Sequence, residues 1–160
     1  MKKERCWLCV TSIAGAVSLL AAWLVLPATL TPGTAEAQAS SVSFPLLEQL
    51  VHYTTVERGE TLEKMLTSKA AIETLQSGKD VPVGTQFVLV DHRNGKLLRY
   101  LVSEKTGQGR DDWQYQSFLP DRSVQHGENP SRCFACHESR NDRQFLFTFS
   151  DVRRYNWQPQ

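Results

Sequence analysis

Residues 81–105 read V-P-V-G-T-Q-F-V-L-V-D-H-R-N-G-K-L-L-R-Y-L-V-S-E-K, and this stretch decides the fold. It holds two runs of β-branched and apolar residues, separated by Asn94 and Gly95. An Asn-Gly pair accepts the positive φ angles of a type I′ turn, which joins two antiparallel strands. The stretch therefore predicts a β-hairpin with strands at about 86–93 and 96–104.

The flanking segments extend this hairpin into a sheet with helices. Residues 51–58 form a β-rich run that ends at Gly59, and residues 113–118 alternate as a further strand of the meander. The apolar run 144–149 also resembles a strand. Residues 67–78 have a helical pattern, with Thr67 or Ser68 as N-cap and Gly78 at the end. Weaker helical turns are expected at 44–50 and 61–66, so the fold class is α+β: an antiparallel meander with helices packed on one side.

The first 37 residues have the order of a secretory signal peptide. A basic start precedes an apolar run that ends at Pro27, and small residues follow up to Ala37. We therefore expect export to the periplasm, a linker at 38–43, one domain at 44–155 and a tail at 156–160. The apolar run is a little short for a span of about 20 residues. An uncleaved leader would instead leave the domain tethered to the membrane.

The charge of the exported part gives no reason to expect a polyanionic partner. Residues 38–160 contain basic and acidic side chains in equal number. Nucleic acids and anionic membranes attract an excess of basic side chains. We therefore expect no nucleic acid as a partner.

The chemistry-bearing motif is N-P-S-R-C-F-A-C-H-E-S at 129–139. The spacing of Cys133, Cys136 and His137 is that of covalent c-type haem attachment. One helical turn brings both thiols under the two vinyl groups of a porphyrin, and the histidine then reaches the iron. The motif predicts one covalent haem c on a C-terminal helix capped by Ser131, with His137 as the metal ligand.

Three other uses of the two cysteines compete with haem. A zinc site needs four ligands, and the mature chain offers no second cysteine pair. A thioredoxin-like dithiol is expected after a strand in a βαβ pattern, whereas this motif follows a polar loop. A disulfide across two intervening residues is strained. Cys6 and Cys9 lie inside the predicted signal peptide.

Four segments together resemble the cytochrome P-460 family, which includes the β-sheet branch of the cytochromes c-prime. They are H-Y-T-T-V-E-R-G at 52–59, V-P-V-G-T-Q-F-V-L-V at 81–90, D-W-Q-Y-Q-S-F at 112–118, and C-F-A-C-H followed by Q-F-L-F-T-F. The resemblance implies an antiparallel sheet with helices against it, often in a homodimer. It also implies a covalent haem with a proximal histidine and an open distal side.

The same resemblance raises the question of a lysine. Family members that oxidise hydroxylamine link a lysine to the porphyrin, in a G-T-x-x-x-K arrangement. Here Gly84 and Thr85 are followed by Leu89 at the lysine's position. Those members also use a distal arginine and a carboxylate, and the corresponding positions, near Leu62 or Glu63 and near Arg99, do not match cleanly. Hydroxylamine oxidation is therefore disfavoured.

We expect an open, largely apolar distal site lined by Phe87 and Leu89, without an acid or a base. Such a site suits a small gas such as nitric oxide, for sensing, carriage or detoxification, with a periplasmic redox partner. Arg132 is the nearest candidate for the haem propionates, with Arg58 and Arg110 as others. The alternatives are a hydroxylamine or nitrogen-species oxidoreductase, and an electron-transfer cytochrome with a sixth ligand. Candidates for that ligand are Met65, His52, His92 and His126.

Overall fold

The computed structural model describes residues 42–157. The predicted signal peptide, most of the predicted linker and the last three residues of the chain lie outside this range. Among the described residues, no helix is both long enough and apolar enough to cross a membrane.

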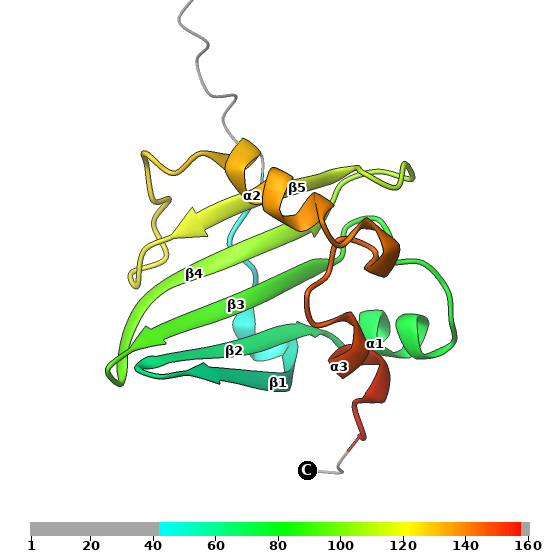
Figure 1. Cartoon of the computed structure of the whole chain (residues 1–160), viewed down its shortest axis with the longest axis horizontal. Coiled ribbons are helices and arrows are strands. Elements are labelled where there is room, and N and C mark those ends of the chain that lie inside the picture. The colour runs from blue at the N-terminus through cyan, green and yellow to red at the C-terminus, as the bar shows by residue number, and fades with distance from the viewer. Residues whose placement is uncertain (1–41, 158–160) are drawn as a thin grey trace, which may run out of the picture. The chain divides into compact units, whose positions relative to one another are not determined.

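The predicted meander is confirmed as a five-stranded antiparallel sheet in the order β1-β2-β3-β4-β5 (Figure 1). Each strand pairs only with its neighbours in sequence. Two-residue turns join the first strand to the second and the third to the fourth, whereas residues 69–85, which include a helix, connect the second strand to the third. The Asn94-Gly95 turn is formed as expected, with φ angles of 50° and 74°. The strands are β1 (Leu50–Arg58), β2 (Thr61–Ser68), β3 (Gln86–Arg93), β4 (Lys96–Lys105) and β5 (Trp113–Phe118).

The expected helical turn at 61–66 is wrong, because these residues belong to β2. Thr61–Ser68 pairs with β1 on one side and with β3 on the other. Gly59, with a φ of 60°, makes the tight turn that brings β2 back along β1. Pairing on both edges outweighs the helical preference of Leu62, Glu63 and Lys64.

The helix after β2 matches its prediction, and the capping residue of the haem-motif helix does not. The α1 helix spans Lys69–Gln76, and the Ser68 side chain accepts a hydrogen bond from the backbone N–H of Ala71. The α2 helix spans Pro130–Glu138, and its N-cap is Asn129 rather than the expected Ser131. Pro130 occupies the first helical turn, where its missing N–H is not needed. The remaining helical segments are the short 3-10 turns η1 (Leu47–Gln49) and η2 (Asn141–Arg143) and the helix α3 (Phe149–Arg154).

The predicted strand at 144–149 is also wrong. Gln144 and Phe145 have positive φ angles, and the chain then turns into α3 at Phe149. The three phenylalanines of this run consequently do not share a face. Phe145 is buried, Phe147 is exposed and Phe149 is half-buried.

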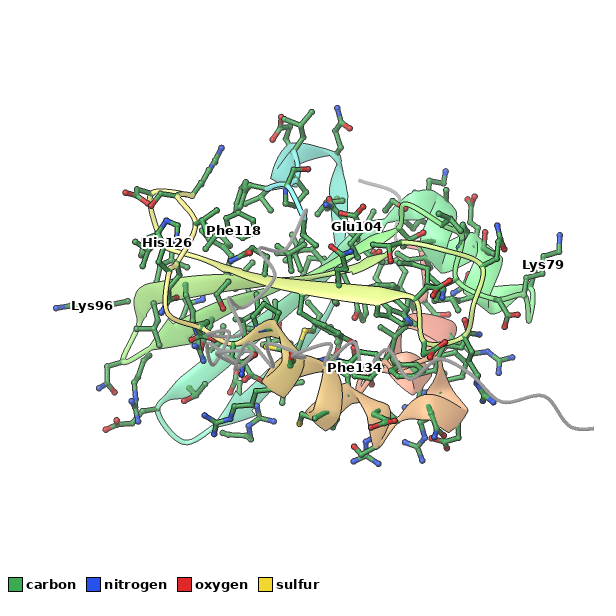
Figure 2. All side chains as sticks on the ribbon, turned by 90° about the horizontal axis from the view of Figure 1, so that it is seen from above. Lys79, Lys96, Glu104, Phe118, His126 and Phe134 are labelled. Atoms are coloured by element: carbon green, nitrogen blue, oxygen red, sulfur yellow. The ribbon has the colours of Figure 1, made fainter. Side chains whose placement is uncertain are left out.

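The two faces of the sheet carry separate apolar clusters. Helices α2 and α3 lie on one face (Figure 1), where Phe87, Trp113 and Tyr115 pack with Phe145 and Val152. The other face is covered by the segment that leads into β1, as part of a cluster that contains Val42, Phe44, Val88, Tyr100, Val102 and Phe118. Figure 2 shows Phe134 on the helical side and Phe118 on the opposite side. Any site between sheet and α2 therefore belongs to the first face.

The turn between β3 and β4 gives a stability prediction. Replacing Gly95 with Ala forces a β-carbon onto a residue with a φ of 74°, which costs about 1–2 kcal/mol for an L-residue. Guanidinium unfolding should show this loss in the free energy of unfolding. Asn94→Gly at the neighbouring position should cost much less, since glycine accepts the same φ range. Equal stability of Gly95→Ala and the parent would contradict the turn.

Candidate functional site

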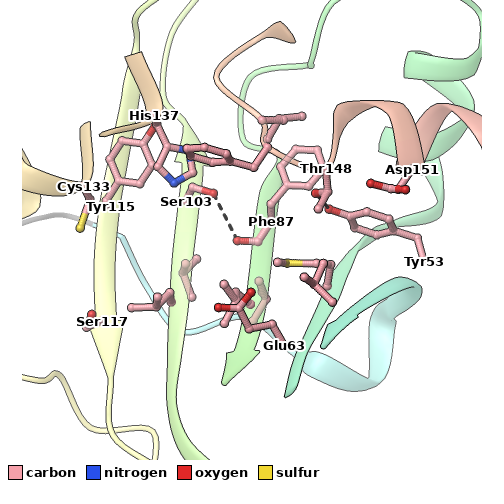
Figure 3. A pocket seen from close by; sticks show the side chains of 18 of the residues that line it. Tyr53, Glu63, Phe87, Ser103, Tyr115, Ser117, Cys133, His137, Thr148 and Asp151 are labelled. Atoms are coloured by element: carbon pink, nitrogen blue, oxygen red, sulfur yellow. Dashed lines mark hydrogen bonds between the residues drawn. The ribbon is translucent and has the colours of Figure 1, made fainter. Parts of the chain in front are cut away.

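A cavity of about 520 Å³ lies between the helical face of the sheet and the chain from α2 to α3 (Figure 3). All five strands contribute to its wall. Its size falls within the range of small-molecule and cofactor sites, about 300–1,000 Å³. The lining residues that matter below are Tyr53, Arg58, Glu63, Met65, Phe87, Leu89, Leu101, Ser103, Tyr115, Ser117, Cys133, His137, Phe147 and Asp151.

The α2 helix presents the haem motif to this cavity. Cys133 and His137 are four residues apart, so they lie on one side of the helix, and both line the cavity. Cys136 is exposed on the adjacent side of the helix, and the two cysteines are not joined by a disulfide. The helix packs over β5, which places the motif at one end of the cavity.

His137 is held in a single orientation. Its Nδ1 atom lies 2.6 Å from the carbonyl oxygen of Phe145. A carbonyl oxygen can only accept a hydrogen bond, so Nδ1 carries the proton. Nε2 is then unprotonated and has a lone pair available to bind a metal. The ring lies 4.7 Å from that of Tyr115 and 5.1 Å from that of Phe147, measured between centroids.

Burial favours the neutral form of this imidazole. It lowers the pKa of His137, and the bond to Phe145 opposes this shift in part. A neutral imidazole with a fixed Nδ1 proton is the form in which histidine binds a metal. The tautomer and the burial of His137 therefore fit the role of iron ligand.

The surroundings of Cys133 do not fit a redox dithiol. Burial is the largest influence on this thiol and raises its pKa, and the nearby Glu128 acts in the same direction. Redox-active cysteines need a lowered pKa, because the thiolate is the reactive species. A zinc site requires further ligands, and no three His, Cys, Asp or Glu side chains converge within residues 42–157.

Phe87 and Leu89 both line the cavity, from neighbouring inward positions on β3. Phe87 is buried, and its ring also contacts those of Tyr53 and Trp113, with centroids 6.4 and 6.2 Å away. Leu89 lies between Met65 on β2 and Leu101 on β4 in the register of the sheet. Together these side chains give the floor of the cavity an apolar centre.

Hydroxyl groups flank this centre on the side of β5. Tyr115 and Ser117 are buried, line the cavity, and have side-chain oxygens with no hydrogen-bond partner in the described part of the chain. The Ser103 hydroxyl makes only a long bond, 3.4 Å, to the Phe87 carbonyl (Figure 3). Buried hydroxyls normally find partners, so these groups fit a cavity whose occupant supplies acceptors.

The expectation that the cavity offers no acid or base is wrong. Glu63 and Asp151 line it, and Arg58 pairs with Glu63 at the end of the cavity near β1 and β2. Glu63 lies directly across from Asp91 on β3, which in turn lies across from Arg99 on β4.

Glu63, Asp91 and Arg99 form a charged row across the sheet, and Arg99 makes two ion pairs in it. It donates to Asp91 over 3.1 Å and to Glu128 over 2.6 Å. The prediction of a helical turn at 61–66 did not indicate that Glu63 faces the cavity. A strand alternation there would have placed Glu63 on the same face as Met65.

Of the other residues predicted for the site, some line the cavity and others lie outside it. Met65 lines the cavity. Arg132 is exposed and does not line it, and Arg110 donates to the Asn141 carbonyl instead. The remaining histidines, His52, His92 and His126, lie outside the cavity wall.

The described lining of the cavity contains no lysine. Leu89 occupies the expected position of the cross-linking residue, on the cavity side of β3. Cys133, His137, Phe87 and Leu89 are thus brought together, whereas Arg132 is left on the surface.

Comparison with known proteins agrees with this geometry. The model of one family, described as Cytochrome P460, matches residues 47–148. The matched range includes β1 to β5, the haem motif and the Phe145 carbonyl that holds His137. Among curated proteins, none matches the chain. Since the match spans well over half of the sequence, the chain belongs to the cytochrome P460 family, and it is a cytochrome that binds haem c.

Proposed function

We propose that the protein is an exported cytochrome with one covalent haem c, whose cavity takes up a small gas such as nitric oxide. One observation carries the proposal. The free Nε2 of His137 and an apolar floor of Phe87, Leu89 and Leu101 belong to the same cavity.

Three residues of α2 would hold the haem. Cys133 and Cys136 would form the thioether bonds, and His137 would ligate the iron through Nε2. When bound, the haem would supply an iron centre able to coordinate a small molecule. The hydrogen bond to the Phe145 carbonyl fixes the tautomer and the orientation of the His137 imidazole, and burial favours its neutral form.

The floor residues would select the ligand by excluding water. Phe87 is buried, and Leu89, Leu101 and Met65 add apolar side chains to the same part of the cavity wall. Burying an unpaired charge or polar group against such a surface is costly, whereas a neutral diatomic molecule loses little. Nitric oxide and carbon monoxide meet this requirement better than anions do.

The cavity wall also supports a second candidate, oxidation of hydroxylamine or a related nitrogen species. Glu63 lines the cavity, its side chain is 14% exposed, and Arg58 pairs with it. A carboxylate in this position can exchange protons with a bound substrate, as proton-coupled oxidation requires. We rank this function second, because Leu89 stands where the cross-linking lysine is expected and no lysine lines the described cavity.

Location and partners complete the proposal. The basic and apolar leader at 1–37 supports export to the periplasm, where a redox partner would exchange electrons with the haem. The sheet order leaves β1 and β5 as edge strands, which allows a homodimer.

Covalent attachment can be tested first. Expressed with a c-type haem maturation system, the parent should carry one haem that survives denaturation, seen as one haem mass on the peptide that contains Cys133. Replacing Cys133 and Cys136 together with Ser should abolish it. Ser131→Ala, a change on the same helix, should not. A parent that loses its haem on denaturation would contradict the proposal.

The coordination state separates gas binding from electron transfer. We expect the reduced parent to be five-coordinate and high-spin, and to take up nitric oxide or carbon monoxide with a change in its absorption spectrum. A low-spin six-coordinate spectrum in both redox states would refute the open site. In that case Met65→Leu, which should restore the high-spin state only if the thioether is the sixth ligand, identifies an electron-transfer cytochrome.

Glu63→Gln separates gas binding from the oxidation of nitrogen species. If the cavity only binds gas, the variant should change the gas affinity by less than about tenfold, and neither protein should oxidise hydroxylamine. If Glu63 moves a proton, the parent should oxidise hydroxylamine, and the variant should be about 10²–10⁴-fold slower, the usual worth of such a group. That second result would reverse our ranking. Lys64→Gln, on the exposed side of the same strand, is the matched control.

A further inference from the structure

We propose that Gln144 is a positioning residue for His137. Its side chain holds residues 144 and 145 in the conformation that aims the Phe145 carbonyl at the imidazole Nδ1. The inference rests on the proposed function, because it concerns the histidine proposed as iron ligand.

The backbone at this point is unusual. Gln144 and Phe145 are consecutive, neither is glycine, and their φ angles are 52° and 62°. L-residues with large side chains rarely adopt this left-handed region. Such a conformation persists only where the surrounding structure enforces it, and it concentrates at functional sites.

Three contacts enforce the conformation here. The side-chain Oε1 of Gln144 accepts a hydrogen bond of 2.7 Å from the backbone N–H of Val81. The Phe145 N–H donates to the Arg140 carbonyl at 2.9 Å. The Phe145 ring is only 3% exposed and lies 5.6 Å from the ring of Phe134 on α2. Of these three contacts, the Gln144 side chain makes only the hydrogen bond with Val81.

The result of this geometry is a fixed acceptor for His137. The Phe145 carbonyl lies 2.6 Å from Nδ1, while the rings of Tyr115 and Phe147 limit rotation of the imidazole. Hydrogen bonding of the second ring nitrogen raises the basicity of a metal-binding histidine and fixes its tautomer. A more basic imidazole stabilises oxidised iron relative to reduced iron, so the contact lowers the reduction potential.

The contact between Gln144 and Val81 also joins two parts of the site. Val81 is buried and lies in the segment between α1 and β3. The β3 strand carries Phe87 and Leu89 on the floor of the cavity. The side chain of Gln144 thus connects two segments: the loop whose Phe145 carbonyl bonds to His137, and the segment that leads into β3.

Two variants of Gln144 and one remote control test the inference. Gln144→Gly removes the bond to Val81 and accepts the positive φ at no cost. Gln144→Glu keeps an oxygen acceptor at the same distance from Val81. Arg122→Gly is the matched control, because Arg122 also has a positive φ, 71°, and lies in the turn after β5, outside the cavity.

We expect Gln144→Gly to raise the reduction potential of the haem-loaded protein. A tenfold change in the ratio of oxidised to reduced protein corresponds to about 59 mV for one electron. Arg122→Gly should stay at the parent's potential. Gln144→Glu should not raise it, because an added carboxylate favours the oxidised iron. An unchanged potential in Gln144→Gly, or an equal shift in Gln144→Glu, would overturn the inference.

A second readout is independent of the haem. Nitrogen NMR of His137 should show a single Nδ1–H tautomer in the parent and in Gln144→Glu, and exchange between tautomers in Gln144→Gly. A single tautomer in Gln144→Gly would also overturn the inference. Failure of covalent haem attachment would defeat the proposed function and leave this comparison of tautomers intact.

Discussion

The hydrogen bond between His137 Nδ1 and the Phe145 carbonyl is the constraint on which the site depends. It joins α2 to the loop that follows it and fixes the proton of His137 on Nδ1, so that Nε2 stays free, while burial favours the neutral form of the ring. Without it, burial alone would leave the tautomer of His137 undetermined. Since this bond already orients His137, the remaining contribution of the sheet is the cavity surface that faces a bound ligand.

That surface follows from the alternation of side chains in a meander. Inward positions on β2, β3 and β4 recur every second residue, so Met65, Leu89 and Leu101 meet in one row across the sheet. Two residues further along, the same alternation brings Glu63 next to Asp91. One geometric rule therefore gives the cavity an apolar centre and a charged end.

The fold could be predicted from sequence where local signals and tertiary structure agree. The Asn94-Gly95 turn and the Ser68 cap are chemical signals that act within a few residues, and both are confirmed. The prediction failed at 61–66, where helix-forming residues are held in a strand by pairing on both edges. It failed again at 144–149, where alternating phenylalanines suggested a strand.

The failures explain which part of the site was missed. CxxCH spacing is a property of a few adjacent residues, so Cys133, Cys136 and His137 could be proposed as haem-binding residues from the chain alone. Glu63 and Phe145 reach the site through pairing and backbone turning that involve distant segments. The left-handed pair at 144–145 carries no glycine or asparagine to signal it. Tertiary contacts hold residues 144–145 in a conformation that their residue types disfavour, and a sequence pattern does not reveal such contacts.

The apolar centre and the charged end of the cavity bear differently on the two proposed functions. Glu63 pairs with Arg58, and Arg99 pairs with both Asp91 and Glu128, so each of these three carboxylates already has an arginine partner. A neutral ligand at the apolar centre is then limited mainly by its size and by the loss of water. A charged or strongly hydrogen-bonding substrate would have to compete with Arg58 or Arg99 for their carboxylate partners. The internal pairing of the charged row therefore supports the proposed uptake of a neutral gas, even though the cavity contains a carboxylate that could serve as a base.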